Sequence, residues 1–265
     1  MAQPRKAVVV GVSGCSSSGK TTLSRLLRDI FPNTFVLHED DFYRAEAELP
    51  MKNGLLDWDC AESLSLLSMA KSLEHIHRDG TFPPDLDSKE DQNSVGECPV
   101  PESTMDSLKA TVKSWAEPGN PGHSLLDSSE SPVRLCILDG FLLYSKSMAE
   151  VLPQIDIRLF LRVSYAKAKA RRDARSGYVT LEGFWEDPPG YVDKIVWPNY
   201  VDDHKWMFEN EDVEGNLKMD VLKESRIQSQ PGEPDVDMTA TLEWAVKLLL
   251  AQLPRIISGS SHTSI

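Results

Sequence analysis

A glycine- and serine-rich stretch near the N-terminus has the residue types and the spacing of a phosphate-binding loop. It reads GVSGCSSSGKTTLSRLL over residues 11–27, and it meets the pattern G-x-x-x-x-G-K-[ST] at Gly14, Gly19, Lys20 and Thr21. Backbone N–H groups of such a loop surround phosphate oxygens, so glycine is needed where the backbone approaches the ligand. Lys20 is expected to reach the β and γ phosphates, and the hydroxyl of Thr21 to bind Mg²⁺.

The pattern therefore predicts a site for a nucleoside triphosphate. The residues expected there are Gly14, Ser16, Ser17, Ser18, Gly19, Lys20, Thr21 and Thr22. The valine-rich run before the loop predicts a buried strand, and leucines at helical spacing over 21–30 predict a helix after it. This strand–loop–helix context is what the motif requires. A serine-rich turn that binds nothing is the alternative interpretation.

Acidic residues follow several of the predicted strands. Asp40 and Asp41 come after one strand, Asp139 after another, and Asp57 and Asp59 stand in the segment LLDWDC. In open α/β sheets, ligands bind at the carboxyl ends of the strands. Phosphoryl transfer needs Mg²⁺ and a group that accepts the proton of the attacking hydroxyl. Asp40 and Asp139 are the candidates for these two roles, and which of them is the base stays open. Helix capping or simple solvation is the alternative for each.

A basic segment lies far along the chain, in KARRDAR. It predicts a helix that carries Arg171, Arg172 and Arg175, with the first and last of these on one face. The glycine-bearing segment RSGYVTLEG follows, so we expect a mobile lid over about residues 171–190 whose guanidinium groups neutralise the transferring phosphoryl group. A solvated basic helix is the alternative.

Strands and helices alternate along the chain, which predicts an α/β fold with a mostly parallel sheet and helices on both faces. Further strands are expected at 34–37, 135–138 and 157–163, with a last strand within GNLKMDVL. Helices are expected at 61–77, after a cap at Ser164, and at 238–253.

The segment over about residues 79–132 is rich in proline, glycine, serine and acidic residues, and only 108–115 looks helical. We interpret it as a mostly disordered or loosely packed insertion in a single domain of 265 residues. Deletion of residues 81–129 should therefore leave activity and melting temperature close to wild type.

Composition limits the classes of partner. The chain has 41 acidic and 28 basic residues and a net charge of −13, which argues against a general nucleic-acid or membrane-surface binder. No apolar run is long enough to span a membrane, and the N-terminal MAQPRK resembles no signal peptide. The four cysteines show no paired spacing, so we expect reduced thiols and a location in the cytoplasm, with the nucleus as an alternative.

Four segments together resemble the nicotinamide riboside kinases, in the uridine kinase-like branch of P-loop kinases. They are GVSGCSSSGKTTL, DDFY followed by KNGLLDWD, LDGFLLY, and RRDAR followed by PPGYVDKIVWPNY. The first is common to many kinases, whereas the last is the most specific. The resemblance covers residues 8–211 without the insertion.

The resemblance implies roles for individual residues, with ATP and Mg²⁺ bound at Lys20 and Thr21. It implies that Asp40 lies at the acceptor 5′-hydroxyl, that Trp58 stacks on the base, and that Asp59 binds the ribose hydroxyls. Arg171 and Arg175 would contact the ATP phosphates, and Arg172 the substrate side. Metal ligands would come from Thr21, Asp40 and Asp139, and further substrate contacts from Asp41, Phe42 and Tyr43.

The implied reaction is ATP-dependent phosphorylation of nicotinamide riboside, with nicotinic acid riboside as a second substrate, in NAD salvage. A pyridinium ring suits the face of Trp58 between two aspartates. Two alternatives stay open. One is a uridine or cytidine kinase. The other is a nucleotide-binding regulator without catalysis, favoured only by Asp139, where relatives often have glutamate. The sequence leaves open the oligomeric state and the choice between ATP and GTP.

Overall fold

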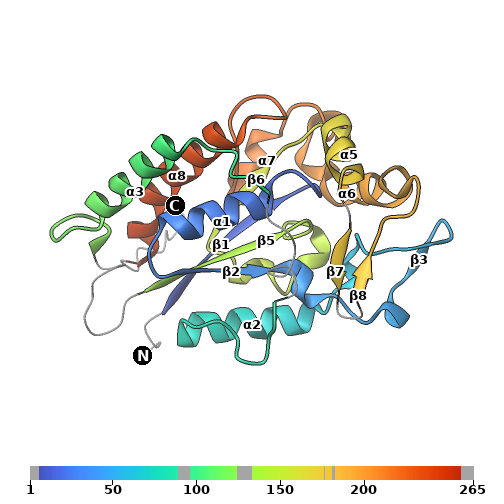
Figure 1. Ribbon diagram of the computed structural model, residues 1–265, viewed down its shortest axis with the longest axis horizontal. Coiled ribbons are helices and arrows are strands. Elements are labelled where there is room, and N and C mark those ends of the chain that lie inside the picture. Colours follow the sequence, from blue (N-terminus) through green and yellow to red (C-terminus); the bar gives the residue numbers. More distant parts are fainter. Residues whose placement is uncertain (1–5, 89–95, 124–132, 176, 181–182, 258–265) are drawn as a thin grey trace.

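The structure is a computed structural model that describes residues 6–88, 96–123, 133–175, 177–180 and 183–257 (Figure 1). Its centre is a five-stranded sheet in the order β2-β5-β1-β6-β9, and all four neighbouring pairs are parallel. The strands are β1 (Ala7–Gly14), β2 (Thr34–His38), β5 (Arg134–Gly140), β6 (Ile157–Leu161) and β9 (Ile227–Ser229). The predicted α/β fold with a mostly parallel sheet is confirmed.

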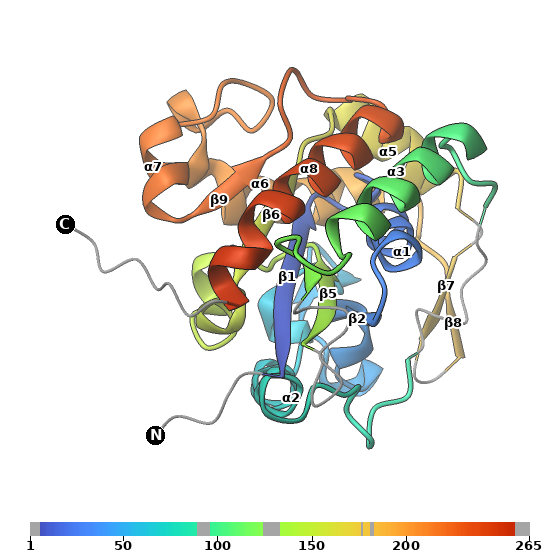
Figure 2. The same ribbon diagram turned by 90° about the vertical axis from the view of Figure 1, so that its left-hand side faces the viewer.

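Helices cover both faces of this sheet. The helices are α1 (Lys20–Ile30), α2 (Leu66–Asp79), α3 (Glu102–Trp115), α5 (Tyr165–Asp173), α6 (Trp197–His204), α7 (Met219–Glu224) and α8 (Met238–Ile257). Figure 2 shows α1, α3 and α8 together on one side of the sheet, with α2 on the other. Because β1 is buried along its whole length, its consecutive valines pack into both cores, Val9 on one face and Val8 and Val10 on the other.

Two short hairpins and several short helical turns complete the fold. The hairpins are β3 (Met51–Lys52) with β4 (Leu55–Leu56), and β7 (Tyr178–Thr180) with β8 (Gly183–Trp185). A π-helical turn, Val192–Val196, leads directly into α6. The 3₁₀ turns are Glu39–Phe42, Glu46–Glu48, Ala61–Ser63, Lys146–Met148, Leu152–Gln154, Lys205–Met207 and Glu209–Glu211.

The expectation for the insertion is wrong over its central part. Residues 102–115 form α3, which begins six residues before the helical stretch expected at 108–115. Met105 and Val112 are buried in the same core as Leu242 and Leu249 of α8. Met105, Leu108, Val112 and Trp115 make an apolar stripe at helical spacing, which the polar composition around it concealed. Residues 89–95 and 124–132 of this segment lie outside the described residues.

Three further expectations need correction at the ends of elements. The helix expected at 61–77 begins only at Leu66, after a separate 3₁₀ turn. The helix in the basic segment ends at Asp173, so Arg175 lies beyond it and does not share a helical face with Arg171. The last strand is β9, because GNLKMDVL forms a loop and α7 instead. The cap at Ser164 is confirmed, since its side chain accepts a hydrogen bond from the Lys167 N–H.

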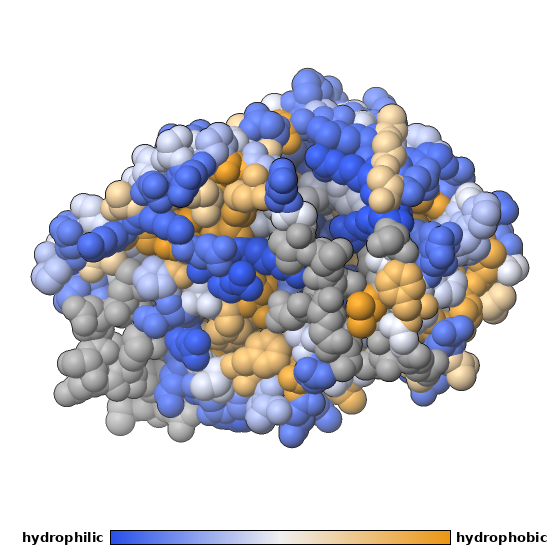
Figure 3. Space-filling model, in the orientation of Figure 1, coloured by the Kyte–Doolittle hydropathy of each residue, from blue (hydrophilic) through white to orange (hydrophobic). Residues whose placement is uncertain are grey.

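Large hydrophobic side chains of the described residues lie mainly in the core. None of the helices in this part of the chain is both long and apolar enough to cross a bilayer. Figure 3 shows hydrophilic residues over much of the face seen in Figure 1, with smaller groups of hydrophobic residues between them. The large exposed hydrophobic side chains are Met51, Leu67, Phe184 and Met219.

Candidate functional site

The predicted phosphate-binding loop connects β1 to α1. Gly14 has φ 149°, and a Cβ there would lie 2.3 Å from the Leu161 carbonyl oxygen. Gly19 has φ 98° and is the N-cap of α1, a left-handed conformation that favours glycine. Both glycines of the motif are therefore required by the backbone itself. The loop leads into the N-terminus of α1, where the helix dipole favours an anion.

Lys20 is the first residue of α1. Its Nζ donates a hydrogen bond of 2.9 Å to the carbonyl oxygen of Cys15, across the loop. Burial lowers the pKa of Lys20, while the nearby Cys15 thiol, Asp139 and Asp40 oppose that shift. The ammonium group thus lies within the loop and close to two of the predicted acidic residues.

Asp139 and His38 form a buried pair at the carboxyl ends of β5 and β2. The two residues are partners in the strand register, and His38 Nδ1 lies 2.6 Å from Asp139 Oδ1. Burial raises the pKa of Asp139, but the charge and hydrogen bond of His38, the hydroxyl of Thr21 and the charge of Lys20 together hold it below its ordinary value. Asp139 therefore stays a carboxylate beside Thr21. Sequence reasoning missed His38, although a histidine directly before the acidic stretch was a visible signal.

The 3₁₀ turn Glu39–Phe42 carries the other acidic residues, and its side chains point to different places. Asp40 is half-buried and lies within electrostatic reach of Lys20. Asp41 is buried, and Phe42 packs in the hydrophobic core with Leu64. The turn thus brings Asp40 toward the loop and directs Phe42 away from it.

Glu39 is a second residue that sequence reasoning missed. It is fully buried, and its Oε2 accepts hydrogen bonds from the backbone N–H groups of Phe141 and Leu142, at 2.5 and 3.2 Å. Burial and the neighbouring Asp40 raise the pKa of Glu39 to about 8, against the effect of these two N–H groups. Glu39 ties the turn that carries Asp40 to the chain that follows Asp139.

The helix α5 connects the loop to the other side of the site. Arg171 donates to the Ser17 carbonyl oxygen at 3.1 Å, and Arg172 to the Ser16 hydroxyl at 2.7 Å. Arg172 is buried and also forms a bidentate ion pair with Asp59, at 3.0 and 3.2 Å. Burial raises the pKa of Asp59, and the guanidinium of Arg172 opposes this shift.

Asp187 is the other carboxylate on Arg172, 2.6 Å from its Nε, and sequence reasoning missed it. It is held in turn by the indole N–H of Trp185 at 2.9 Å. Arg175 is exposed beyond the end of α5. Of the three predicted arginines, the structure brings Arg171 and Arg172 to the loop and leaves Arg175 outside the helix.

An aromatic cluster surrounds Trp58. The ring of Tyr43 meets it edge-on at 5.1 Å between centroids, and Trp185 lies at 5.5 Å. Phe141 stacks on Tyr43, at 6.4 Å between centroids. Trp58 is 6% exposed, and its indole N–H has no hydrogen-bond partner among the described residues. Trp185 comes from the hairpin β7–β8, so the predicted lid contributes a ring to this cluster that the sequence did not indicate.

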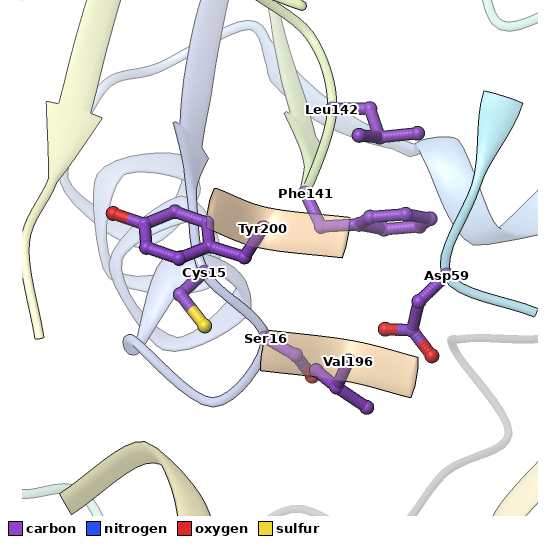
Figure 4. A pocket seen from close by; sticks show the side chains of 7 residues that line it. All are labelled: Cys15, Ser16, Asp59, Phe141, Leu142, Val196 and Tyr200. Carbon is purple, nitrogen blue, oxygen red and sulfur yellow. The ribbon is translucent and has the colours of Figure 1, made fainter. Parts of the chain in front are cut away.

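A small pocket lies between the loop, Asp59 and α6. Figure 4 shows the seven residues that line it, Cys15, Ser16, Asp59, Phe141, Leu142, Val196 and Tyr200. Asp59 and Ser16 reach it from different segments, and both are bonded to Arg172. The pocket therefore borders both the predicted phosphate loop and the predicted ribose-binding carboxylate.

Comparison with known proteins decides the family. The chain is 39% identical over 249 residues to the nicotinamide riboside kinase of Schizosaccharomyces pombe, covering 94% of this chain and 99% of that protein. The chain belongs to the nicotinamide riboside kinase family. The enzyme of the same name from Saccharomyces cerevisiae is 30% identical over 249 residues, covering 93% of this chain and 97% of that protein.

Other comparisons add little to this family assignment. No protein-family model matches the chain. A solved structure described as that of a "Possible Uridine Kinase" from Bacillus stearothermophilus has a TM-score of 0.39 and 14% identity, over 76% of this chain and 84% of that one. This likeness is too weak to bear on function.

Proposed function

We propose that this nicotinamide riboside kinase transfers the γ-phosphoryl group of ATP to the 5′-hydroxyl of nicotinamide riboside, which gives nicotinamide mononucleotide and ADP. The observation that carries the proposal is Arg172, whose guanidinium bonds at once to Ser16 of the phosphate loop and to Asp59. A single side chain thus joins a triphosphate site to a carboxylate suited to ribose hydroxyls. We call residues 14–22 with Arg171 the phosphate half of the site.

In the phosphate half, the chain supplies charge and N–H groups to the triphosphate. Lys20 would exchange its bond to the Cys15 carbonyl for the β and γ phosphates, which gives the buried ammonium an anionic partner in direct contact. Arg171, 3.1 Å from the Ser17 carbonyl oxygen, would bind phosphate oxygens from the other side of the loop.

We assign the proton acceptor to Asp40. Asp139 is already bonded to His38 and near Thr21, and its lowered pKa makes it a weak base. Asp40 is half-buried on the 3₁₀ turn beside Lys20. The 5′-oxygen forms its bond to the γ-phosphorus, the bond from that phosphorus to the bridging oxygen breaks, ADP leaves, and Asp40 takes the hydroxyl proton.

The residues around Thr21 fit a magnesium ion. Within the described part of the chain, no group of three or more histidine, cysteine or acidic side chains forms a metal centre. Mg²⁺ in kinases needs few protein ligands, since phosphates and waters complete its shell. The neighbouring Thr21 hydroxyl and Asp139 carboxylate offer such a pair, with Asp40 close by. When bound, the ion neutralises charge on the phosphate oxygens.

The riboside half of the site comprises Trp58, Asp59, Arg172 and Trp185. Asp59 and Arg172 would share the ribose hydroxyls, one accepting and one donating hydrogen bonds. Trp58 and Trp185, whose rings lie 5.5 Å apart, would supply aromatic contacts to the base, and a cationic pyridinium is attracted to aromatic faces. Nearby acidic side chains, Asp57, Asp59 and Asp187, favour the same charge. These features support a pyridinium riboside over the neutral uridine.

The surroundings of the cysteines support a reducing location. All four are free, and Cys15 and Cys136 are buried. We therefore propose that the enzyme works in the cytoplasm, where thiols stay reduced.

The test is ADP release with nicotinamide riboside, nicotinic acid riboside, uridine and cytidine, each with ATP and Mg²⁺. We expect kcat/KM to be highest for a pyridine riboside. The variant Lys20→Ala, as a control, should lose turnover by about 10³-fold with an unchanged fold, because it removes the loop cation that meets the transferred group. A preference for uridine or cytidine would overturn the substrate assignment. If none of the four nucleosides causes ADP release, the kinase proposal is overturned.

A further inference from the structure

A single residue of α6 holds the loop that carries Trp58 and Asp59. Asn199 is buried, and its Nδ2 donates to both carboxylate oxygens of Asp57, at 2.9 and 3.0 Å. The same amide nitrogen donates to the carbonyl oxygen of Asp59, at 3.0 Å. One amide group thus bonds to the loop on both sides of Trp58, although Asn199 lies 140 residues after Asp59 in the sequence.

The orientation of this amide is determined by its partners. A carboxylate and a carbonyl oxygen can only accept hydrogen bonds, so both must face the NH₂ group of Asn199. The ammonium of Lys52, in the hairpin β3–β4, can only donate, and it contacts Asn199 Oδ1. Both ends of the amide group therefore have a partner. Through Lys52, the hairpin acts on the loop indirectly, because Lys52 contacts Asn199 and Asn199 contacts the loop.

The other contacts of the loop agree with this role. The backbone N–H of Trp58 donates to the Tyr191 hydroxyl at 3.0 Å, and the N–H of Asp59 to Asp57 Oδ1 at 3.0 Å. Asp57 therefore uses its carboxylate to build a turn, in which an aspartate bonds to the backbone two residues on. Asp59 instead turns its carboxylate to Arg172. Two aspartates that look alike in the sequence have different tasks.

The element that carries Asn199 is unusual. The π-helical turn Val192–Val196 runs directly into α6, and such turns often occur at functional sites. Tyr191, at the start of that turn, and Asn199, after it, both bond to the loop 57–59. The π turn therefore determines the distance along the helix between the Tyr191 hydroxyl and the Asn199 amide.

We propose that Asn199 is a positioning residue for the riboside, oriented by Lys52, and that it acts by holding Trp58 and Asp59 in place. The inference rests on the proposed function only in assigning this loop to the riboside. It predicts that losing the amide weakens riboside binding and leaves the phosphate half intact.

The experiment compares Asn199→Ala, Lys52→Met and the double variant with the wild type. For Asn199→Ala we expect KM for nicotinamide riboside to rise about tenfold or more, because the buried Asp57 carboxylate loses the amide that donates to both of its oxygens. KM for ATP should stay unchanged, and kcat should stay within about threefold. Lys52→Met should raise the riboside KM by about threefold, and should add nothing in the Asn199→Ala background if Lys52 acts through the amide.

The hairpin supplies a matched control. Asn53 Nδ2 donates to the Lys194 carbonyl oxygen at 3.0 Å, which ties the same hairpin to the same π turn without touching Asn199 or the loop. Asn53 has φ 53°, so Asn53→Gly removes the side chain without backbone strain. This variant should leave the riboside KM unchanged. Equal effects of Asn53→Gly and Asn199→Ala, an equal rise in both KM values, or additive Lys52 and Asn199 effects would overturn the proposal.

Hydrogen exchange separates this proposal from the proposed function. The peptide over residues 55–60 should exchange faster in Asn199→Ala than in the wild type or Asn53→Gly, whatever the enzyme phosphorylates. If the wild type phosphorylates no riboside, the proposed function fails. The exchange rate of residues 55–60 then tests whether Asn199 holds the loop in place. Unchanged exchange in Asn199→Ala would overturn that role even in an active enzyme.

Discussion

Apart from Arg171, the phosphate half is built from one short stretch of chain, whereas the riboside half is gathered from several distant ones. Gly14, Gly19 and Lys20 lie within seven consecutive residues, from the last residue of β1 to the first of α1. Trp58 and Asp59 depend on Arg172 from α5, Trp185 from β8 and Asn199 from α6. A contiguous loop keeps its shape through its own backbone, but an assembled surface keeps its shape only while its supporting segments stay packed.

This difference has a kinetic consequence. Changes at the phosphate half and at the acidic residues beside it should act mainly on kcat, because these groups meet the reacting atoms. Changes in the riboside half should act mainly on KM, because its contacts are made equally before and during the reaction.

The largest expected effect lies where the two halves meet. Asp40→Asn should lower kcat by about 10²–10⁴-fold with little change in KM for ATP, because the amide cannot take the hydroxyl proton. Asp139→Asn should instead raise the Mg²⁺ concentration needed for half-maximal rate. Steady-state kinetics over a Mg²⁺ titration distinguishes the two. Near-normal kcat in Asp40→Asn, together with its loss in Asp139→Asn at saturating Mg²⁺, would reverse the assignment.

A smaller effect is expected within the riboside half. Asp59→Asn should raise KM for nicotinamide riboside more than Trp58→Leu does, because it leaves Arg172 without one of its two carboxylates. Trp58→Leu should raise that KM by about 3- to 30-fold, the equivalent of roughly 0.5–2 kcal/mol of cation–π attraction. Steady-state kinetics with nicotinamide riboside and uridine measures both.

Phe184 offers a control for the tryptophan. It is 61% exposed on β8, next to Trp185, so Phe184→Leu should leave KM unchanged. A greater loss of kcat than of riboside affinity in Trp58→Leu would contradict the proposed difference between the halves.

The last expected effect concerns stability in acid and not catalysis. His204 on α6 is buried beside Tyr200, and burial lowers its pKa to about 4, although its bond to the Tyr200 carbonyl opposes the shift. The unfolded chain binds a proton at this histidine near pH 6.5, and the folded chain does not. The contribution of His204 to the free energy of unfolding is therefore fully present above pH 6.5. It decreases by about 3 kcal/mol as the pH falls toward 4.

Denaturant unfolding between pH 7 and pH 4 measures this effect. His204→Leu should have lower stability at pH 7, because the bond to Tyr200 is lost, but a shallower decline toward pH 4. Parallel curves for the two proteins would show that His204 is not buried in its neutral form. Because α6 also carries Asn199, riboside affinity should fall before ATP affinity as the pH decreases.

Several parts of the fold could be predicted because their signals are local. The consecutive valines of β1, the glycines of the loop and the cap at Ser164 each depend on residues within a few positions. Only residues 108–115 of α3 were predicted to be helical, because its apolar stripe is short and lies in a polar segment. This helix becomes stable only by packing on α8, because the stability of short helices comes mostly from tertiary contacts.

The sequence by itself determined the phosphate loop, the alternation of strands and helices, and the residue types of the site. Only the tertiary structure decided which of those residues meet. His38 meets Asp139 across 101 positions, Arg172 meets Asp59 across 113, and Asn199 meets Asp57 across 142. Backbone conformation depends on neighbouring residues, whereas these contacts depend on the order and register of parallel strands and on helices packed far along the chain. A pattern in the sequence identifies a carboxylate, but only the fold supplies its partner.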